Sequence, residues 1–317
     1  MVLIPGEEAV NIFLQSFSSP LLDFIFQIIT LLGDELFIIF LLVVVFWAIE
    51  KRMGFLLAIV LMFSQTLNWL LKSLFALPRP YVEFPSQVNL IGPEELSFAF
   101  PSGHSQNIAT IWPFLTGWLR NKWLALLTII LIILVPLSRI YLGVHYLSDV
   151  IGGVFFGLII VAGYFLLAER LQELWDRFTY QQQIVIALLT PLVVFLGIFL
   201  IFPTTFVEGR DPGLSLGVLF GGFLAIFAEQ RYINMETKGV ETRAKIFRII
   251  LGFPIVIATY FVLSALFGLI GDSLGVTEGL LFGLLRFVRY AILAIIGIFI
   301  CPLLFVKLEP KIFGEKK

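Results

Sequence analysis

Charged residues are scarce in this chain. Asp, Glu, Lys and Arg make up 14% of its 317 residues, against about 25% in an ordinary soluble domain. Hydrophobic residues make up 59%, and the mean hydropathy is +1.01. This composition excludes an ordinary soluble protein and predicts an integral membrane protein. The net charge of −1 points to no particular partner, so we expect membrane lipids around the chain and no nucleic acid.

Cysteine and histidine are the rarest reactive side chains. The one cysteine, Cys301, excludes an intramolecular disulfide and any cysteine-based metal cluster, and its apolar surroundings predict a small buried hydrophobe. The two histidines, His104 and His145, both lie in short polar islands of an otherwise apolar sequence. Because histidine titrates near neutral pH, these positions indicate chemistry rather than packing.

Long apolar runs predict an all-α multi-pass fold. A spanning helix needs about 20 mostly apolar residues, and the polar breaks leave ten candidates. The first carries Asn11, Gln15 and Asp23, so an amphipathic helix along the membrane surface is the alternative there. The candidates are residues 8–33, 35–49, 53–71, 102–119, 123–138, 147–168, 180–202, 213–229, 246–270 and 278–306.

The distribution of Lys and Arg predicts the orientation. Cytoplasmic loops accumulate these residues, and with alternating spans one side receives only Lys72, Arg79, Arg139 and Arg210. The other side receives the rest of the 21, apart from the intramembrane Arg286 and Arg289, and is therefore predicted to be cytoplasmic. We expect a prokaryotic plasma-membrane protein whose active face is extracytoplasmic. If the first candidate segment does not cross the membrane, only the predicted side of the N-terminus changes.

One shift of composition divides the chain. The polar stretch Glu169–Arg177 separates a motif-bearing half from a second half of about four helices. We expect a motif-bearing helical core with a preceding N-terminal segment at 1–170, a four-helix membrane region of unknown role at 178–306, and a basic cytoplasmic tail at 307–317.

The first polar island joins Lys72 to Arg79. Lys72 ends an apolar helix, and Pro78 and Pro80 on both sides of Arg79 hold the backbone extended. Arginine offers a planar fork for a phosphate, and lysine adds a compact point charge. On the positive-poor side of the membrane, this pair indicates an anion site.

The second and third islands supply the histidines. Pro101-Ser102-Gly103-His104 opens a predicted helix, whose free N–H groups and dipole favour an anion. In the third island, Arg139 follows Ser138, and His145 stands four residues before Asp149. If the helix has begun by then, this spacing lets the carboxylate hold the Nδ1 proton and leave Nε2 free to attack.

Together the islands describe phosphoryl transfer. Three cations and a helix N-terminus bind a tetrahedral oxyanion, one histidine attacks phosphorus, and the other protonates the leaving oxygen. This set needs neither a metal ion nor another cofactor, because guanidinium and ammonium groups stabilise the equatorial charge.

The three islands resemble the motifs of the type 2 phosphatidic acid phosphatase superfamily, which includes the vanadium haloperoxidases. The family's motifs are Lys, six residues, Arg-Pro; then Pro-Ser-Gly-His; then Ser-Arg, five residues, His, three residues, Asp, and all three match here. The resemblance covers about residues 20–168 and implies a six-helix core. The apolar runs add about four C-terminal helices, which match none of the family's motifs. It also implies the following roles: His145 as nucleophile, His104 as general acid, Asp149 as orienting carboxylate, and Lys72, Arg79, Ser102, Gly103 and Arg139 as phosphate ligands.

A lipid phosphate is the favoured substrate class. The segment from Tyr81 to Phe98 is apolar enough to touch the bilayer, and the candidates are phosphatidate, phosphatidylglycerol phosphate, a polyprenyl pyrophosphate and a long-chain base phosphate. The alternatives are a lipid phosphotransferase, a sugar-phosphate phosphatase, and a phosphatase whose C-terminal helices transport lipid.

Two further patterns predict local packing. Gly153 and Gly157 have the small-xxx-small spacing of closely packed helices. Arg286 and Arg289 lie inside an apolar run, which indicates either a polar cavity with Asp272 or Glu278 as partner, or side chains that reach the membrane surface.

Overall fold

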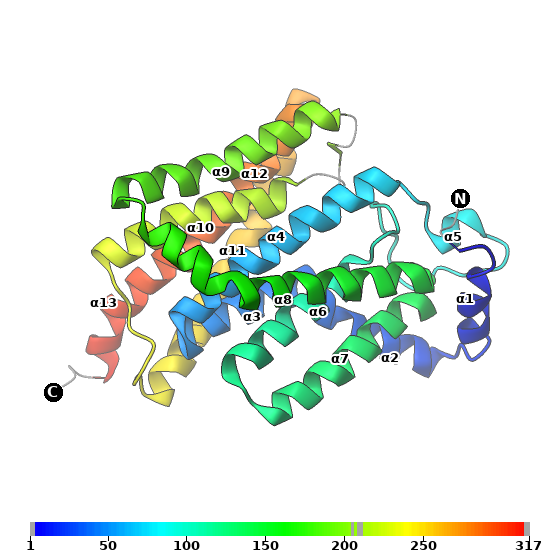
Figure 1. Ribbon diagram of the computed structural model, residues 1–317, viewed down its shortest axis with the longest axis horizontal. Helices are drawn as coiled ribbons and strands as arrows, with labels where there is room; N and C mark the ends of the chain where they lie inside the picture. Colours follow the sequence, from blue (N-terminus) through cyan, green and yellow to red (C-terminus); the bar gives the residue numbers. More distant parts are fainter. Residues whose placement is uncertain (1–3, 204–205, 208–211, 314–317) are drawn as a thin grey trace. The chain divides into compact units, whose positions relative to one another are not determined.

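The computed structural model describes residues 4–203, 206–207 and 212–313, and these residues form helices joined by loops, of which that between α5 and α6 is long (Figure 1). Arg210 and residues 314–317 of the predicted tail lie outside the described ranges. The elements are α1 (Glu8–Gln15), α2 (Pro20–Thr30), η1 (Leu31–Gly33), α3 (Glu35–Val44), η2 (Val45–Ile49), α4 (Lys51–Phe75), α5 (Pro80–Glu83), α6 (Gly103–Leu119), α7 (Lys122–Tyr141), α8 (Leu147–Asp176), α9 (Tyr180–Ile201), α10 (Gly213–Tyr232), α11 (Thr242–Leu274), α12 (Gly279–Ile295), η4 (Ile296–Ile300) and α13 (Cys301–Phe313).

Seven helical segments of the described chain are long and apolar enough to cross a membrane, which confirms the all-α membrane fold. They correspond to seven of the ten spans predicted from sequence. Their bounds are Lys51–Glu83, Lys122–Tyr141, Leu147–Asp176, Tyr180–Ile201, Gly213–Tyr232, Thr242–Leu274 and Gly279–Phe313. The last segment runs to Phe313, so the described part of the predicted tail at 307–317 continues the final helix.

The first two predicted spans are wrong as separate crossings. Residues 8–33 break at Ser19, whose hydroxyl accepts a hydrogen bond from Leu22 N and starts α2. The segments Pro20–Gly33 and Glu35–Ile49 pass the length and apolarity test only as a pair, bent by 48°. Helix α1 is therefore a separate helix of eight residues, and its polar residues Asn11 and Gln15 donate to backbone carbonyl oxygens of the protein, such as Ile140 O and Asn89 O.

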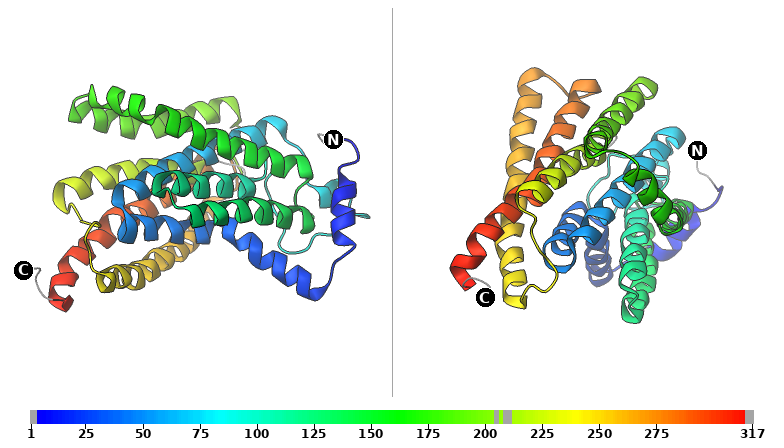
Figure 2. Two further views of the ribbon diagram at one scale, coloured as in Figure 1. Left: turned by 60° about the horizontal axis from the view of Figure 1, so that its bottom comes forward. Right: turned by 60° about the vertical axis from the view of Figure 1, so that its left-hand side comes forward.

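The fourth predicted span is shorter than a spanning helix usually is. Helix α6 has 17 residues, so at 1.5 Å per residue it is about 26 Å long, slightly less than the roughly 30 Å of a hydrocarbon core. Its buried residues include four polar ones, Ser105, Gln106, Asn107 and Thr110, beside apolar ones such as Ile108 and Phe114. Helix α6 packs beside α7 along most of its length, as the views of Figure 2 show. The buried polar residues of α6 thus serve contacts inside the protein.

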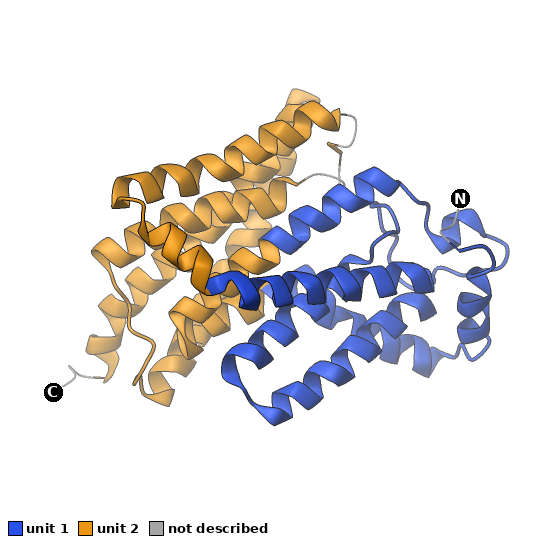
Figure 3. Cartoon of the chain, in the orientation of Figure 1, with its two compact units in different colours: residues 1–38, 63–168, 208–210 blue, residues 39–62, 169–207, 211–317 orange. Residues whose placement is uncertain are grey.

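The chain forms two compact units, coloured separately in Figure 3. Unit 1 takes the residues up to Ile38 together with Phe63–Ala168, and unit 2 takes Ile39–Met62 and the described residues from Glu169 onward. Helices α3, α4 and α8 therefore contribute to both units. The sequence-based boundary near residue 170 stays a prediction, and the compact unit that holds the C-terminal half also includes residues 39–62.

Close helix contact in unit 1 confirms the prediction for Gly153 and Gly157. A Cβ at Gly153 would lie 2.5 Å from Ser102 O, and one at Gly157 would lie 2.7 Å from Gln106 O and 2.8 Å from Ala109 Cβ. Only glycine lets the backbone of α8 approach the first turns of α6 so closely.

A buried polar network joins α4 to α6 in the same unit. Gln106 Nε2 donates to Ser64 O and Ser64 Oγ, both at 2.8 Å, and Asn68 Nδ2 donates to Gln106 Oε1 at 2.8 Å and to Pro101 O at 3.2 Å. Buried polar groups with satisfied hydrogen bonds fix one arrangement of their helices. The network therefore holds the Pro101 end of α6 against α4.

Unit 2 is built on the contact of α10 with α12. A Cβ at Gly217 would lie 2.2 Å from Phe287 O, and one at Gly221 would lie 2.1 Å from Ala291 O. Cys301 is fully buried in a cluster with Trp47 and Phe305, as its apolar surroundings predicted. The pairing of Arg286 and Arg289 with Asp272 or Glu278 stays a prediction. Their guanidinium groups lie over aromatic rings, those of Phe282, Tyr260 and Tyr290.

Candidate active site

The end of α4 and the extended chain after it carry the first two cations. Lys72 lies in the last turn of α4, and its ammonium group donates to the carbonyl oxygens of Phe98 and, at 3.3 Å, of Ala99. Arg79 has φ −82° and ψ 157°, which is the extended conformation predicted from the flanking prolines. Both side chains are buried and point to the loop that precedes α6.

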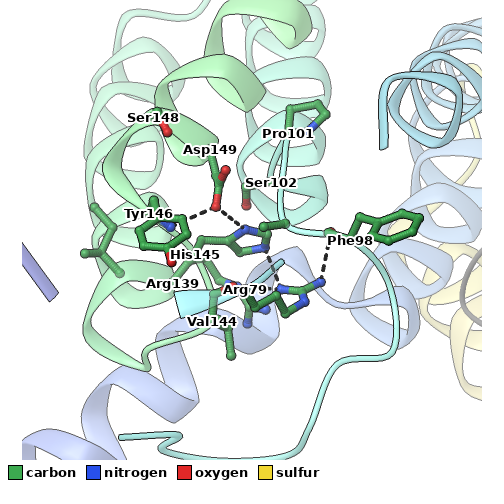
Figure 4. A network of polar contacts seen from close by, with 12 residues as sticks. Arg79, Phe98, Pro101, Ser102, Arg139, Val144, His145, Tyr146, Ser148 and Asp149 are labelled. Carbon is green, nitrogen blue, oxygen red and sulfur yellow. Dashed lines mark hydrogen bonds and ion pairs between the residues drawn. The ribbon is translucent and has the colours of Figure 1, made fainter. Parts of the chain in front are cut away.

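The guanidinium group of Arg79 contacts the loop before α6 and the histidine loop. Its Nε donates to Ser97 O at 2.8 Å, and its Nη1 donates to Val144 O at 2.9 Å. Nη1 also lies 3.2 Å from His145 Nε2 (Figure 4). A guanidinium group has donors only, so His145 Nε2 must accept this hydrogen bond and carry no proton.

Asp149 fixes the other side of the imidazole. Its Oδ2 lies 3.2 Å from His145 Nδ1 and accepts a hydrogen bond from Tyr146 N at 2.8 Å (Figure 4). Helix α8 begins at Leu147, so His145 stands just before the helix rather than inside it. The predicted pair forms nevertheless, because the carboxylate turns back to the free N–H groups at the helix start. Nδ1 then holds the proton, and Nε2 presents its lone pair.

Charge and burial keep His145 neutral. Burial of the ring, followed by the positive charges of Arg79 and Lys72, holds the pKa of His145 well below its ordinary value. Burial also raises the pKa of the neighbouring Tyr146 hydroxyl above its ordinary value, so that group stays protonated. The loop before α8 therefore holds an unprotonated ring nitrogen next to the positively charged side chains of Arg79 and Lys72.

Helix α6 begins at the same place. Ser102 is its N-cap, with Oγ accepting from Ser105 N at 3.4 Å and from Ser105 Oγ at 3.0 Å, and Ser102 N donates to Asp149 O at 2.9 Å. Gly103 starts the helix. The ring of His104 packs against Gly33 of η1, where a Cβ would lie 2.8 Å from its Cδ2. The structure thus joins the backbone of Ser102 to that of Asp149, with Gly103 next in the chain, while Gly33 lies against the ring of His104.

Arg139 completes the set of cations. Its Nη1 donates to Thr30 Oγ1 at 2.7 Å, and its Nη2 forms an ion pair with Glu95 Oε1. Glu95 Oε2 in turn lies 2.8 Å from Arg79 Nη2. Ser138 faces away, because its hydroxyl donates to Val135 O at 2.6 Å. One carboxylate therefore bridges the two arginines that the sequence assigned to phosphate.

Sequence reasoning missed four side chains around the site. Glu95 and Thr30 contact Arg139, and two residues near α1 hold the histidine loop from outside. Asn11 Nδ2 donates to Ile140 O at 2.8 Å and to His145 O at 3.0 Å, and the Glu7 carboxylate accepts from Ser148 N at 3.0 Å and Ser148 Oγ at 2.9 Å. For Asn11 and Thr30 the available signal was a polar side chain in a segment predicted to span the membrane, 8–33, whereas Glu7 and Glu95 lie outside that segment.

The apolar side chains between Tyr81 and Phe98 are divided between the protein interior and the surface. Tyr81, Leu90 and Ile91 pack against the buried cluster of Tyr141, Leu142 and Val144, whereas Val82 and Leu96 are exposed. Of the loop between α5 and α6, the part next to α6 lies at the site, because carbonyl oxygens of residues 97–99 accept hydrogen bonds from Arg79 and Lys72.

Two family profiles match the chain. The PAP2 superfamily matches residues 53–173, which contain all eight predicted site residues, and the PAP2 superfamily phosphatase transmembrane extension matches residues 213–312. Phosphatidylglycerophosphatase B of Bacillus subtilis is 31% identical over 186 residues, covering 55% of this chain and 86% of that protein. The chain belongs to the PAP2 superfamily.

Further relatives of this superfamily are lipid phosphatases. The undecaprenyl-diphosphatase of Sulfolobus acidocaldarius is 33% identical over 105 residues, covering 32% of this chain and 49% of that protein. The crystal structure of a transmembrane PAP2-type phosphatidylglycerolphosphate phosphatase from Bacillus subtilis covers 52% of this chain and 85% of that one, with 29% identity and a TM-score of 0.45. This PAP2 protein is a multi-pass membrane enzyme of the lipid phosphatase class. Its C-terminal helices, which had no assignment from motifs, match the transmembrane extension of such phosphatases.

Proposed function

We propose that this PAP2 protein hydrolyses the terminal phosphate of a lipid phosphate monoester or diphosphate through a phosphohistidine on His145, without a metal ion. The observation that carries the proposal is the state of His145. Its Nδ1 is held by Asp149 at 3.2 Å, and its Nε2 lone pair faces the Arg79 guanidinium at 3.2 Å. A phosphate bound to Arg79 is then within reach of the nucleophile.

In the first step, Nε2 of His145 forms a bond to phosphorus while the bond from phosphorus to the lipid oxygen breaks. His104 gives its proton to that oxygen, and the lipid alcohol leaves. In the second step, water attacks the phosphohistidine, His104 accepts the proton, and inorganic phosphate is released with His145 neutral again.

Five groups are assigned to the phosphate oxygens. The cations are Lys72, Arg79 and Arg139, and the start of α6 adds Ser102 and Gly103. Their positive charge is fixed before substrate arrives, since Lys72 and Arg79 are held by carbonyl oxygens of the surrounding loops. Such a site stabilises the charge of a phosphoryl transition state without reorganising.

The active face is assigned to the extracytoplasmic side. The bias of Lys and Arg toward the opposite loops supports this orientation. The contacts of Asn11 and Glu7 with the histidine loop support an N-terminus on the same face, as expected when the first two predicted spans form one bent crossing.

The test is release of phosphate by the purified protein in mixed micelles containing EDTA. The panel consists of phosphatidate, phosphatidylglycerol phosphate, undecaprenyl diphosphate, a long-chain base phosphate and glucose 6-phosphate. We expect turnover of at least one lipid substrate, slow turnover of glucose 6-phosphate, inhibition by vanadate, and no activity in His145→Ala. Loss of wild-type activity in EDTA that magnesium restores would contradict the metal-independent mechanism, and full activity of His145→Ala would contradict the phosphohistidine. Transfer of phosphate to an added lipid alcohol in place of water would favour a phosphotransferase.

His104 is tested separately by the leaving group. An aryl phosphate needs little protonation of its leaving oxygen, whereas an alkyl phosphate needs it fully, and a general acid contributes about 10²- to 10⁴-fold. We therefore expect His104→Ala to slow phosphorylation of the enzyme far more with a lipid phosphate than with p-nitrophenyl phosphate. Equal losses with both substrates would contradict the assignment of His104 as the acid.

A further inference from the structure

The Glu95 carboxylate occupies the anion site itself. Its two oxygens contact two different guanidinium groups, Oε2 with Arg79 Nη2 at 2.8 Å and Oε1 with Arg139 Nη2. These are the two arginines assigned to the substrate phosphate. A carboxylate and a phosphate present similar oxygen pairs to a guanidinium fork, so Glu95 stands where two phosphate oxygens would bind.

Glu95 is also the outer member of this group. The side chains of Arg79 and Arg139 are 2% and 4% exposed, whereas that of Glu95 is 25% exposed. An incoming anion therefore meets Glu95 before it reaches either arginine. The resting site is closed by a side chain with a path to the solvent.

The backbone around Glu95 is anchored independently of its carboxylate. Tyr81 OH donates to Glu95 O at 3.2 Å, and the next residue but one, Ser97, accepts from Arg79 through its carbonyl oxygen at 2.8 Å and its hydroxyl at 2.9 Å. These contacts do not involve the Glu95 carboxylate, so they hold the loop in place wherever that carboxylate lies. Displacement of the carboxylate requires no rearrangement of the site.

We propose that Glu95 is a specificity-determining residue that admits only phosphate groups able to outcompete its carboxylate. The proposal rests on the proposed function, because it assumes that Arg79 and Arg139 bind the substrate phosphate. A terminal phosphate carries about −1.5 to −2 charges near neutral pH, so it displaces the singly charged carboxylate. A phosphodiester carries one charge and gains nothing over it. Glu95 thereby excludes the phosphodiester headgroups that surround the enzyme in a phospholipid bilayer, and it promotes release of the product phosphate.

The experiment compares wild type with Glu95→Gln in mixed micelles, using the lipid phosphate that the panel shows to be hydrolysed fastest. Two inhibitors are titrated: orthophosphate, and phosphatidylmethanol as a phosphodiester with one negative charge. Phosphatidylcholine at the same mole fraction controls for surface dilution. Glu94→Gln is the matched control, because it removes the same charge from an exposed neighbouring position.

We expect Glu95→Gln to lower the Ki of orthophosphate about tenfold or more, the factor that corresponds to about 1.5 kcal/mol for one hydrogen bond to a charged group. Phosphatidylmethanol should become an inhibitor of this variant while leaving wild type and Glu94→Gln unaffected. If Glu95 only positions the arginines, the Ki of orthophosphate in Glu95→Gln is unchanged or raised, and the proposal is refuted.

Two further measurements separate the test of Glu95 from the test of the phosphohistidine on His145. If Glu95→Gln has too little activity for inhibition assays, calorimetric binding of orthophosphate to the variant gives the same comparison, with tighter binding expected and unchanged or weaker binding refuting the proposal. The mechanism is judged by His145→Ala alone. Activity of that variant would overturn the phosphohistidine, whereas an unchanged Ki in Glu95→Gln would overturn only the role of Glu95.

Discussion

Replacing Asp149 by asparagine separates the two contributions of this carboxylate. Oδ2 accepts from both His145 Nδ1 and Tyr146 N, so an asparagine keeps its oxygen at this position, and the Nδ1 tautomer is preserved. What is lost is the negative charge. As Nε2 bonds to phosphorus, the imidazole ring becomes positively charged, and that charge is no longer compensated.

The size of the effect follows from the distance. With the nearest ring nitrogen at 3.2 Å, the mean separation of the two charges is roughly 4 Å, and at an effective dielectric constant of about 20 their interaction is about 4 kcal/mol. This corresponds to a fall in kcat of about 10³-fold. Substrate affinity should change much less, because the ring is neutral before attack.

The assay is steady-state phosphate release, with Asp23→Asn as the matched control. Asp23 accepts hydrogen bonds from Ser18 and Tyr141 in the same unit but does not contact His145, so its variant should retain kcat within about tenfold. A kcat of Asp149→Asn that also stays within tenfold of wild type would refute the charge-stabilising role.

Three other predictions concern pH, packing and topology. His145 must be unprotonated to attack, and its pKa lies below the ordinary 6.5. With both a monophosphate and a diphosphate substrate, kcat/KM should therefore stay constant as the pH falls through 6.5 and decline only below that pH. A decline centred at or above pH 6.5 with both substrates would contradict the neutral resting state of His145. Gly157→Ala should lower the free energy of unfolding in detergent by about 1–3 kcal/mol because of overpacking, and so lower the melting temperature. Gly163→Ala should not, because nothing lies within 4 Å of a Cβ at that position. Equal melting temperatures of the two variants would contradict the close contact of α8 with α6. In intact cells, an impermeant maleimide should label the Ser86→Cys variant, whereas it should label the exposed position of Lys238→Cys only after permeabilisation. The native Cys301 is buried and should give little background. The reverse pattern of labelling would place the site on the cytoplasmic side.

Much of the fold was predictable because a segment that crosses a lipid bilayer has to be long, apolar and regularly hydrogen-bonded. Runs such as 180–202 and 246–270 have to be helical to satisfy their backbone groups in a bilayer, and both are helices in the structure. Helix α6 and the N-terminal segment were harder to predict. Their polar residues contact other parts of the protein, such as Gln106 with Ser64 and Asn11 with the histidine loop. The spacing of apolar residues in the sequence does not reveal such partners.

The candidate site was predictable where residues close in sequence act together. His145 and Asp149 are four residues apart, and their pairing followed from spacing, although the helix starts two residues later than His145. Glu95 was not predictable in this way. It lies far along the chain from Arg139, and a glutamate in a loop is ordinarily a solvated side chain, so only the three-dimensional contacts reveal that it bridges the two arginines.

The most direct test of the central claim is to find the phosphate on the enzyme during turnover. Protein quenched with alkali in the presence of a hydrolysed lipid phosphate should yield, by mass spectrometry, a peptide phosphorylated on His145, and the modification should be stable to alkali and lost in acid. His104→Ala should retain the modification, and His145→Ala should lack it. Turnover without any phosphate on His145, or a phosphate on another residue in its place, would contradict the account.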